Sequence, residues 1–167
     1  MQRVMVIGCP GCGKSTFSRA LRDRTGLPLY YLDMLYWNAD KTVVSRDVFH
    51  ARLAKILESD AFILDGNYAS TMEMRLSACD TVFFLDYPLV VCLDGIKTRL
   101  GKSREDMPWI ETEFDPEFMD FIHRFSTESR PKILALLAKY SHVKVFAFTS
   151  RAEAEAYLSS MDAKNPI

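Results

Sequence analysis

The sequence is poor in cysteine, carries no excess of either charge and contains no long apolar run. Four cysteines in 167 residues are too few for a disulfide scaffold, and no run approaches the ~18 apolar residues of a membrane-spanning helix. The 21 basic and 22 acidic side chains leave a net charge of −1, whereas proteins that bind nucleic acid carry a basic surplus. These absences argue against a disulfide-rich protein, a membrane protein and direct nucleic-acid binding.

What remains is the composition of one globular domain. Apolar residues make up 49% of the chain and charged residues 26%, which are average values, and single cores usually run to ~100–200 residues. We therefore expect residues 1–167 to form a single domain. The segment Met1–Ile7 leads directly into a glycine-rich loop and is too short for a signal peptide, so we expect a cytoplasmic protein without a membrane partner.

Residues 8–15 match the phosphate-loop pattern G-x-x-x-x-G-K-[ST]. The apolar run Val4–Ile7 predicts a buried strand before this loop, and the spacing of Phe17 and Leu21 predicts a helix after it, ending near Gly26. In such a loop the backbone amides converge on phosphate oxygens, the lysine bridges the β- and γ-phosphates, and the hydroxyl binds Mg²⁺. The pattern predicts a site for ATP and Mg²⁺ formed by Gly8, Cys9, Pro10, Gly11, Cys12, Gly13, Lys14, Ser15 and Thr16.

Two cysteines of this loop allow other interpretations. Cys9 and Cys12 have the spacing of a zinc half-site or a redox pair, but no second close Cys/His pair completes a zinc site. A redox role stays open, because a Cys9–Cys12 disulfide would stiffen the loop and block the nucleotide.

Apolar runs alternate with helical patterns along the rest of the chain. Further strands are predicted at Leu29–Leu32, Ala61–Leu64, Thr81–Leu85 and Val143–Phe148. Helices are predicted after the capping residue Ser45 to Leu57, over Leu89–Leu100, over Pro131–Tyr140 and near Arg151–Met161. This alternation predicts an α/β fold of the three-layer P-loop NTPase type, with a five-stranded parallel sheet flanked by helices.

Three of the predicted strands are followed directly by an aspartate: Asp33, Asp65 and Asp86. Ligands of parallel sheets bind beyond the carboxyl ends of the strands, where the glycine loop also lies. We therefore expect one of these carboxylates to hold or orient Mg²⁺ and another to bind the substrate or accept a proton from its hydroxyl. Any single aspartate can instead be an ordinary polar strand end.

Arginines and prolines gather between the fourth and fifth predicted strands. Phosphoryl transfer spreads negative charge over the transferred group, and arginines that close on it are a recurrent solution. We therefore predict a helical lid insertion over about residues 101–130, with Arg99, Arg104 and Arg130 as catalytic candidates and solvated surface arginines as the alternative. Pro131 should push residue 130 out of helical geometry.

The chain resembles the P-loop nucleoside-monophosphate-kinase-like superfamily. Residues 61–66 look like the strand and Asp-Gly of adenylate kinases, residues 84–88 are similar to the end of their next strand, and Arg99 matches their phosphate-contacting arginine. The resemblance implies that Asp65 orients Mg²⁺ through water. Two departures set the chain apart from adenylate kinase itself: Asn67-Tyr68-Ala69 replaces the family's Phe-Pro-Arg, and Gly95 replaces the arginine that stacks on adenine.

A closer resemblance is to the small adenylate-kinase-like proteins known as DNA topology modulation proteins, or FlaR-related proteins. The segments that carry it, together with the glycine loop, span nearly the whole chain: residues 32–37, 63–68, 75–76, 80–86 and 129–131. The resemblance implies the fold and the use of ATP. It implies little about DNA, because altered supercoiling can follow from altered metabolism.

The acceptor site is the least determined part of the sequence. Asp33 is a candidate substrate ligand or general base, while Asn67, Tyr68 and Arg75 are candidate substrate contacts with packing or surface roles as alternatives. Backbone near Thr149, Ser150 and Arg151 is the candidate adenine contact. Several aromatic residues either line the acceptor pocket or belong to the core: Tyr36, Trp37, Trp109, Phe114, Phe118, Phe121 and Phe125.

Three functions stay open. The first is an ATP-dependent phosphotransferase acting on a nucleotide or another small-molecule acceptor. The second is an ATP-binding regulatory NTPase with a nucleotide-dependent protein partner, and the third is a DNA topology factor, against which the near-neutral charge argues. No motif identifies the acceptor or the oligomeric state.

Overall fold

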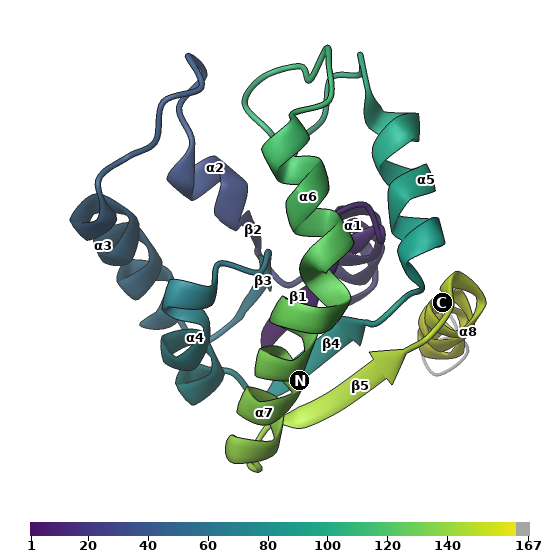
Figure 1. The fold of residues 1–167 in the computed structure, drawn as a ribbon. Helices are drawn as coiled ribbons and strands as arrows, with labels where there is room; N and C mark the ends of the chain where they lie inside the picture. Colours follow the sequence, from purple (N-terminus) through teal and green to yellow (C-terminus); the bar gives the residue numbers. More distant parts are fainter. Residues whose placement is uncertain (163–167) are drawn as a thin grey trace.

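Five strands form one parallel sheet in the computed structural model, which describes residues 1–162 (Figure 1). They are β1 (Arg3–Gly8), β2 (Leu29–Tyr31), β3 (Phe62–Asp65), β4 (Thr81–Leu85) and β5 (Lys144–Phe148). Their order across the sheet is β2-β3-β1-β4-β5, and Met5 of the central strand pairs with Leu64 on one side and Val82 on the other. The prediction of a five-stranded parallel sheet is confirmed.

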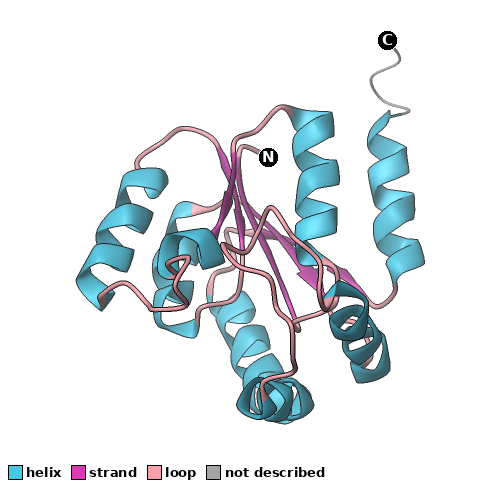
Figure 2. Ribbon diagram, turned by 90° about the horizontal axis from the view of Figure 1, so that it is seen from above, coloured by secondary structure: helices cyan, strands magenta, loops and turns pink. Residues whose placement is uncertain are grey.

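Helices cover both faces of the sheet (Figure 2). The crossover through α1 (Lys14–Thr25) runs from β1 towards the β2 edge, whereas α3 (Arg46–Leu57), α4 (Met72–Ala78) and the helices between β4 and β5 belong to crossovers in the opposite direction. Because such crossovers are right-handed, the two directions place their helices on opposite faces. After β5, α8 (Arg151–Asp162) packs against α1 on the same face of the sheet.

Local sequence signals set two of the helix ends. The Ser45 side chain accepts a hydrogen bond from the backbone N–H of Val48 and so caps α3. Gly26 ends α1 with φ 70°, a left-handed conformation, and its N–H donates to the Arg22 carbonyl. Both ends lie where the sequence predicts them.

The sequence did not predict a short helix, α2 (Leu32–Tyr36), directly after β2. Asp33 therefore lies in the first turn of a helix rather than at the end of a strand. This turn directs the chain away from the sheet before α3 begins.

The prediction that Pro131 removes residue 130 from helical geometry is wrong. α6 (Pro116–Arg124), a π-helical turn (Phe125–Ser129) and α7 (Arg130–Lys139) follow one another without a break, and the Arg130 N–H donates to the Phe125 carbonyl. The π turn makes residue 130 a new helix start, and proline is tolerated in the first turn of a helix. Phe125 is buried in the core, so it is not a pocket residue.

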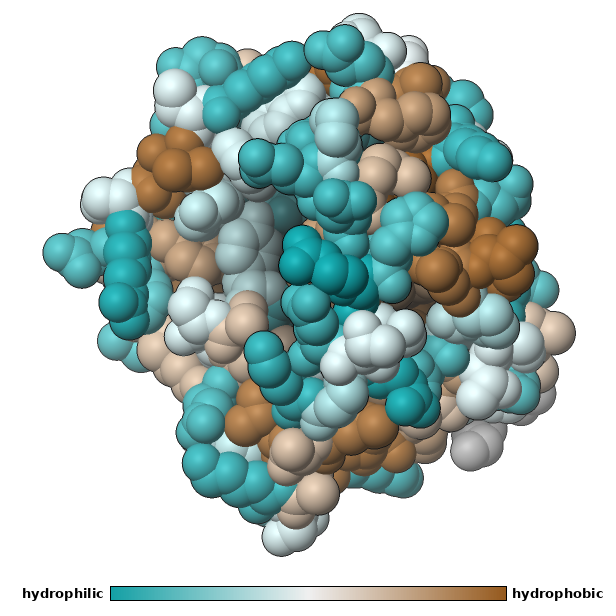
Figure 3. All heavy atoms as spheres, in the orientation of Figure 1, coloured by the Kyte–Doolittle hydropathy of each residue, from teal (hydrophilic) through white to brown (hydrophobic). Residues whose placement is uncertain are grey.

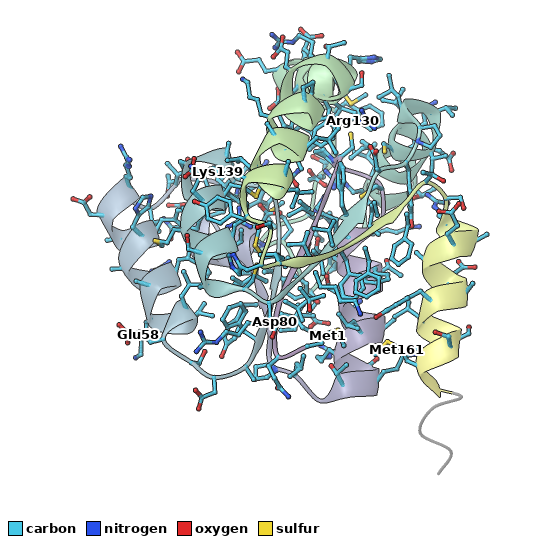
Figure 4. The ribbon with its side chains drawn as sticks, turned by 90° about the horizontal axis from the view of Figure 1, so that it is seen from below. Met1, Glu58, Asp80, Arg130, Lys139 and Met161 are labelled. Atoms are coloured by element: carbon cyan, nitrogen blue, oxygen red, sulfur yellow. The ribbon has the colours of Figure 1, made fainter. Side chains whose placement is uncertain are left out.

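The α5–α6 loop, which we define as residues 100–115, connects α5 (Leu89–Arg99) to α6 and has no helix or strand. This loop and the face of α6 that carries Phe118 and Phe121 border the cavity described below. Ile122 and Phe125 are buried in the core. At the other end of the sheet, Asp80 lies near Met1 and accepts hydrogen bonds from the N–H groups of Gln2 and Arg3 (Figure 4). Within residues 1–162 no helix is both long and apolar enough to cross a membrane.

Candidate active site

A cavity of about 1490 Å³ lies beyond the carboxyl ends of the strands. Ligand pockets typically measure ~300–1,000 Å³, so this one has room for two small ligands. Figure 3 shows the surface hollowed between the α2 side and the α5–α6 side of the molecule. The glycine loop follows the central strand β1 and therefore lies between the β2–β3 side and the β4–β5 side of the cavity.

The glycine loop has the local geometry of an anion site. Gly11 and Gly13 have φ 82° and 99°, left-handed values that other residues adopt at a cost. Pro10 through Thr16 line the cavity, and α1 begins at Lys14 with its N-terminus at the loop. The Lys14 Nζ donates to the carbonyl oxygens of Gly8 at 3.1 Å and of Cys9 at 3.3 Å, which holds the ammonium across the loop.

The loop rests directly on α5. An ideal Cβ on Gly95 would lie 2.0 Å from the Gly11 oxygen, and one on Gly11 would lie 2.1 Å from the Cys92 oxygen. The backbones of α5 and of the glycine loop are therefore in contact at Gly95, the position that matches an arginine of adenylate kinases. This explains a glycine in the middle of a helix, where glycine is otherwise unfavourable.

We predict that Gly95→Ala destabilises the protein by ~1–3 kcal/mol and weakens binding at the loop, because the new methyl group must displace backbone. Thermal unfolding and nucleotide titration measure the two effects. Val90→Ala is the matched control, since Val90 is 71% exposed on the same helix, and changes at exposed sites usually stay within ~0.5 kcal/mol. Equal stability of Gly95→Ala and Val90→Ala would contradict the close approach.

Three carboxylates line the cavity near Ser15: Asp33, Asp65 and Asp106. The Ser15 hydroxyl donates to the Asp106 Oδ2 at 3.0 Å, and the Tyr68 hydroxyl donates to the Asp33 Oδ1 at 2.6 Å. The Asp65 Oδ2 is buried without a hydrogen-bond partner among the described residues. Sequence reasoning missed Asp106, which follows no strand and lies 91 positions from Ser15.

Burial sets the charge state of these carboxyl groups. Burial raises the pKa of Asp65 to about 7, against the lowering effects of Lys14 and the Ser15 hydroxyl, and Asp33 and Asp106 raise it further. Burial likewise raises the pKa of Asp33, while the hydrogen bond from Tyr68 and the charge of Lys14 lower it. The cavity thus favours an added cation near Asp65.

The donor set fits Mg²⁺. A serine hydroxyl, the unpartnered oxygen of Asp65 and the carboxylate of Asp106 are hard oxygen ligands, which Mg²⁺ prefers. Within the described residues no three acidic, histidine or cysteine side chains form a metal site by themselves. This also fits Mg²⁺, which usually takes one or two carboxylates together with substrate phosphates.

Arg99 and Arg104 both reach the cavity and share one carboxylate. Glu111 accepts from the Arg99 Nη2 at 3.1 Å and from the Arg104 Nη2 at 3.0 Å, and Arg104 also donates to Asp106 at 3.2 Å. Through Asp106 this network runs from the α5–α6 loop to Ser15 of the glycine loop. Arg151 lines the cavity at the start of α8, on the β5 side, and donates weakly to the Val91 carbonyl.

Arg130 and Asp86 lie outside the cavity lining and bind each other. The Arg130 Nε donates to the Asp86 Oδ1 at 2.8 Å, and its Nη2 donates to the Oδ2 at 2.8 Å. The partnership joins α7 to the end of β4, and Figure 4 shows Arg130 on the α6–α7 segment. The structure therefore gives Arg130 no place among the cavity arginines and Asp86 none among the cavity carboxylates.

Arg75 is fully buried beneath the turn that follows β3, so it cannot contact a ligand in the cavity as the sequence predicted. Its guanidinium donates to the carbonyl oxygens of Gly66, Asn67 and Tyr68 and to the Thr71 hydroxyl. A planar group with five donors satisfies several carbonyls at once, which no other side chain does. Arg75 supports the residues of this turn instead of binding a substrate.

Asn67 reaches the cavity and holds the glycine loop. Its Oδ1 accepts from the Gly8 N–H at 3.1 Å, and its Nδ2 donates to the Gly8 oxygen at 2.7 Å. The Asn67 side-chain amide thus binds both the N–H and the carbonyl of Gly8. A phenylalanine, which the matching motif of adenylate kinases has at this position, has no polar group for these two hydrogen bonds. Tyr68, the next residue, also lines the cavity, and its hydroxyl donates to Asp33 there.

The cysteines of the glycine loop are free and buried. Burial raises the pKa of the Cys12 thiol to about 11, and a hydrogen bond with the Cys92 thiol raises the pKa of Cys9. Since the thiolate is the reactive form, both groups are poor nucleophiles here. The thiol beside Cys9 is thus Cys92 of α5, a contact that the Cys9–Cys12 spacing did not indicate.

The aromatic candidates divide between cavity and core. Phe114, Phe118 and Phe121 line the cavity from the α5–α6 loop and α6. Tyr36, Trp37, Tyr68 and Trp109 line it on the β2–β3 side, where the rings of Trp37 and Trp109 lie 5.1 Å apart. The cavity thus has an aromatic end near Asp33 and a second end near α8.

No protein-family model matches this sequence, and no curated protein matches it. Among solved structures it is similar to the shikimate kinase of Bacteroides thetaiotaomicron, with TM-score 0.58, 17% identity, and coverage of 98% of this chain and 97% of that one. It is also similar to the shikimate kinase of Aquifex aeolicus, with TM-score 0.57, 19% identity, and coverage of 95% and 93%. At these identities the likeness shows a P-loop kinase-like fold, and no narrower family is supported.

Proposed function

We propose that this chain is an ATP-dependent phosphotransferase that acts on a hydroxyl group of a small molecule. The observation that carries the proposal is one cavity that joins the Lys14–Ser15 loop to the Asp33–Tyr68 pair. The glycine loop supports triphosphate binding, and the fold is that of small-molecule kinases. A site of 1490 Å³ accommodates a nucleotide and an acceptor together.

In the proposed reaction the acceptor hydroxyl attacks the γ-phosphorus. A new bond forms between the acceptor oxygen and phosphorus, the bond to the β,γ-bridging oxygen breaks, and ADP leaves. We assign the proton of the hydroxyl to Asp33, which lines the cavity and whose Oδ1 already accepts from Tyr68, so that Oδ2 is the oxygen assigned to the acceptor. Burial, which raises the pKa of Asp33, makes it a stronger base than an exposed aspartate.

Cations neutralise the charge of the transferred group. Lys14 binds the phosphates, and Arg99 and Arg104 exchange Glu111 for phosphate oxygens when the nucleotide is bound. Ser15, Asp65 and Asp106 would hold Mg²⁺, which would neutralise negative charge on the phosphates.

The direct test is ADP release from MgATP in the presence of nucleosides, nucleoside monophosphates and small alcohols that can be phosphorylated. Stimulation by one class supports a kinase and identifies its acceptor. A flat panel, with MgATP still bound, contradicts the kinase and favours the regulatory NTPase.

We predict that Asp33→Asn lowers kcat by at least ~100-fold, because general-base catalysis by a positioned side chain typically contributes ~100- to 10,000-fold. MgATP affinity should not change. Asp94→Asn is the control, since Asp94 is exposed on α5 outside the cavity lining. A variant with unchanged kcat and a raised KM for the acceptor would assign Asp33 to binding alone.

A further inference from the structure

Both tryptophans of the chain lie at the same end of the cavity. Trp37 follows α2, Trp109 belongs to the α5–α6 loop, and their rings meet edge to face at 5.1 Å and 82°. Tyr36 lies 5.3 Å from Trp37 and 5.0 Å from Tyr68. We call these four residues the aromatic wall: Tyr36, Trp37, Tyr68 and Trp109.

The aromatic wall ends at the proposed base. Tyr68 is both the last ring of the wall and the donor to Asp33, so a ring packed on the wall lies beside the carboxylate. Ring–ring contacts of this kind are favourable for flat apolar groups and demand no charge. A hydroxyl attached to such a ring reaches the free oxygen of Asp33.

The charges at this end disfavour an anion. Four carboxylates line this part of the cavity: Asp33, Asp65, Asp106 and Glu111. Asp65 and Asp106 are the proposed Mg²⁺ ligands, so Asp33 and Glu111 remain as the negative groups that an acceptor would meet. The nearest cations are engaged. Arg99 and Arg104 pair with Glu111 and Asp106 and, in the proposed reaction, turn to the phosphates of the nucleotide. Lys14 belongs to the glycine loop.

The other cations do not change this balance. Arg24 and Arg151 line the cavity at its α8 end, where Arg24 donates to the Leu158 carbonyl and Arg151 begins α8. Arg19 donates to the Thr16 hydroxyl on its own helix, α1.

Lys41 lines the cavity from the exposed turn after Trp37, where water screens its charge. Arg75 is fully buried against backbone carbonyls. A carboxylate or phosphate on the acceptor would therefore meet acidic groups without a preformed partner.

We infer that the acceptor is a hydroxyl-bearing ring compound that carries neither a carboxylate nor a phosphate. The inference rests on the proposed function, whose acceptor site it specifies. It differs from what the name of a shikimate kinase implies, since shikimate carries a carboxylate.

Binding can be measured without catalysis, because the only two tryptophans report on this end. With saturating MgADP to fill the nucleotide site, thymidine and adenosine should quench or shift tryptophan fluorescence, whereas thymidine monophosphate and shikimate should not. Tighter binding of either anionic compound overturns the inference, and so does the absence of a response to both nucleosides.

Turnover separates this inference from the proposed function. Nucleosides that bind and also stimulate ADP release support both. Nucleosides that bind without any ADP release support the inference on the ligand and contradict the kinase. ADP release stimulated only by the anionic compounds supports the kinase and overturns the inference.

A variant series tests the aromatic wall itself. Trp109→Ala should weaken nucleoside binding about tenfold, because it removes a ring on which the base stacks, whereas Trp109→Phe should retain most of the affinity. Ile110→Ala is the control, because Ile110 is 45% exposed in the same loop and does not line the cavity. Equal nucleoside affinity of the three variants, measured by calorimetry, overturns the role of the wall.

Discussion

Replacing Lys14 with alanine is expected to abolish the stabilisation of this protein by MgATP. At a ligand concentration of ~1,000 Kd, binding raises the free energy of unfolding of the unaltered protein by about 4 kcal/mol. For a domain of this size that corresponds to a rise of about 10 °C in Tm. The variant should show no such rise.

The physical reason lies in where the ammonium is held. The Lys14 Nζ is held across the loop by the carbonyl oxygens of Gly8 and Cys9, so its side chain is already ordered where the triphosphate is proposed to bind. Burial lowers its pKa, but the nearby Cys12, Asp65 and Asp33 raise it overall, so it stays charged. No other cation of the cavity occupies the loop.

The quantity to compare between the variant and the unaltered protein is the rise in Tm on addition of MgATP, not Tm itself. Lys14→Ala also removes the positive charge beside Asp65 and Asp33, which alters the stability of the free protein. Lys97→Ala is the matched control, because Lys97 is exposed on α5 and lies outside the cavity lining. Equal shifts in the two variants would remove the assignment of the glycine loop as the triphosphate site.

The sequence predicts those parts of the fold that depend on residues close together in the sequence. The apolar run, the glycine loop and the helix after them are consecutive, and Ser45 caps a helix that begins at the next residue. Strand positions follow from short apolar runs. Their parallel arrangement then follows from the helices between them.

The parts of the site that the sequence does not predict depend on contacts between distant residues. Asp86 meets Arg130 across 44 positions, and Ser15 meets Asp106 across 91. No periodicity or motif encodes these pairs. Arg99 is predicted from its family resemblance, whereas Arg104 and Arg130 are predicted only from their residue type and their place between the fourth and fifth strands. That reasoning does not separate Arg104, which lines the cavity, from Arg130, which does not.

Glu111 and Asp106 change how the arginines of the cavity act. Neither acidic residue is part of a motif, yet each determines which cation is free to meet a phosphate. In the proposed reaction the two arginines that share Glu111 would exchange its carboxylate for phosphate oxygens, so the energy of their pairing would offset part of what the nucleotide contributes. This exchange would couple the α5–α6 loop to nucleotide binding through charge.

Arg75→Met is expected to lower the free energy of unfolding by ~3–5 kcal/mol, because each buried carbonyl left without a donor costs ~1–3 kcal/mol. The side chain is fully buried, and its guanidinium satisfies carbonyls of Gly66, Asn67 and Tyr68 in one turn. Urea unfolding measures the loss. Arg124→Met is the control, because the Arg124 side chain is 61% exposed and its contacts, with the Asp120 carbonyl and the Glu128 carboxylate, lie within one turn of its own helix.

The same variant decides between the two roles given to Arg75. The sequence predicts a contact with an anionic acceptor, and that role would raise the KM for the acceptor while leaving stability unchanged. The structure predicts a different result. The free energy of unfolding falls, and Asp33 becomes misaligned because Tyr68, which binds it, belongs to the turn that Arg75 supports. Arg75→Lys should recover little of the loss, since an ammonium does not present the planar fork that meets several carbonyls together. Because the burial of Arg75 removes a cation from the acceptor end, a purely structural effect of Arg75→Met also supports an acceptor without negative charge.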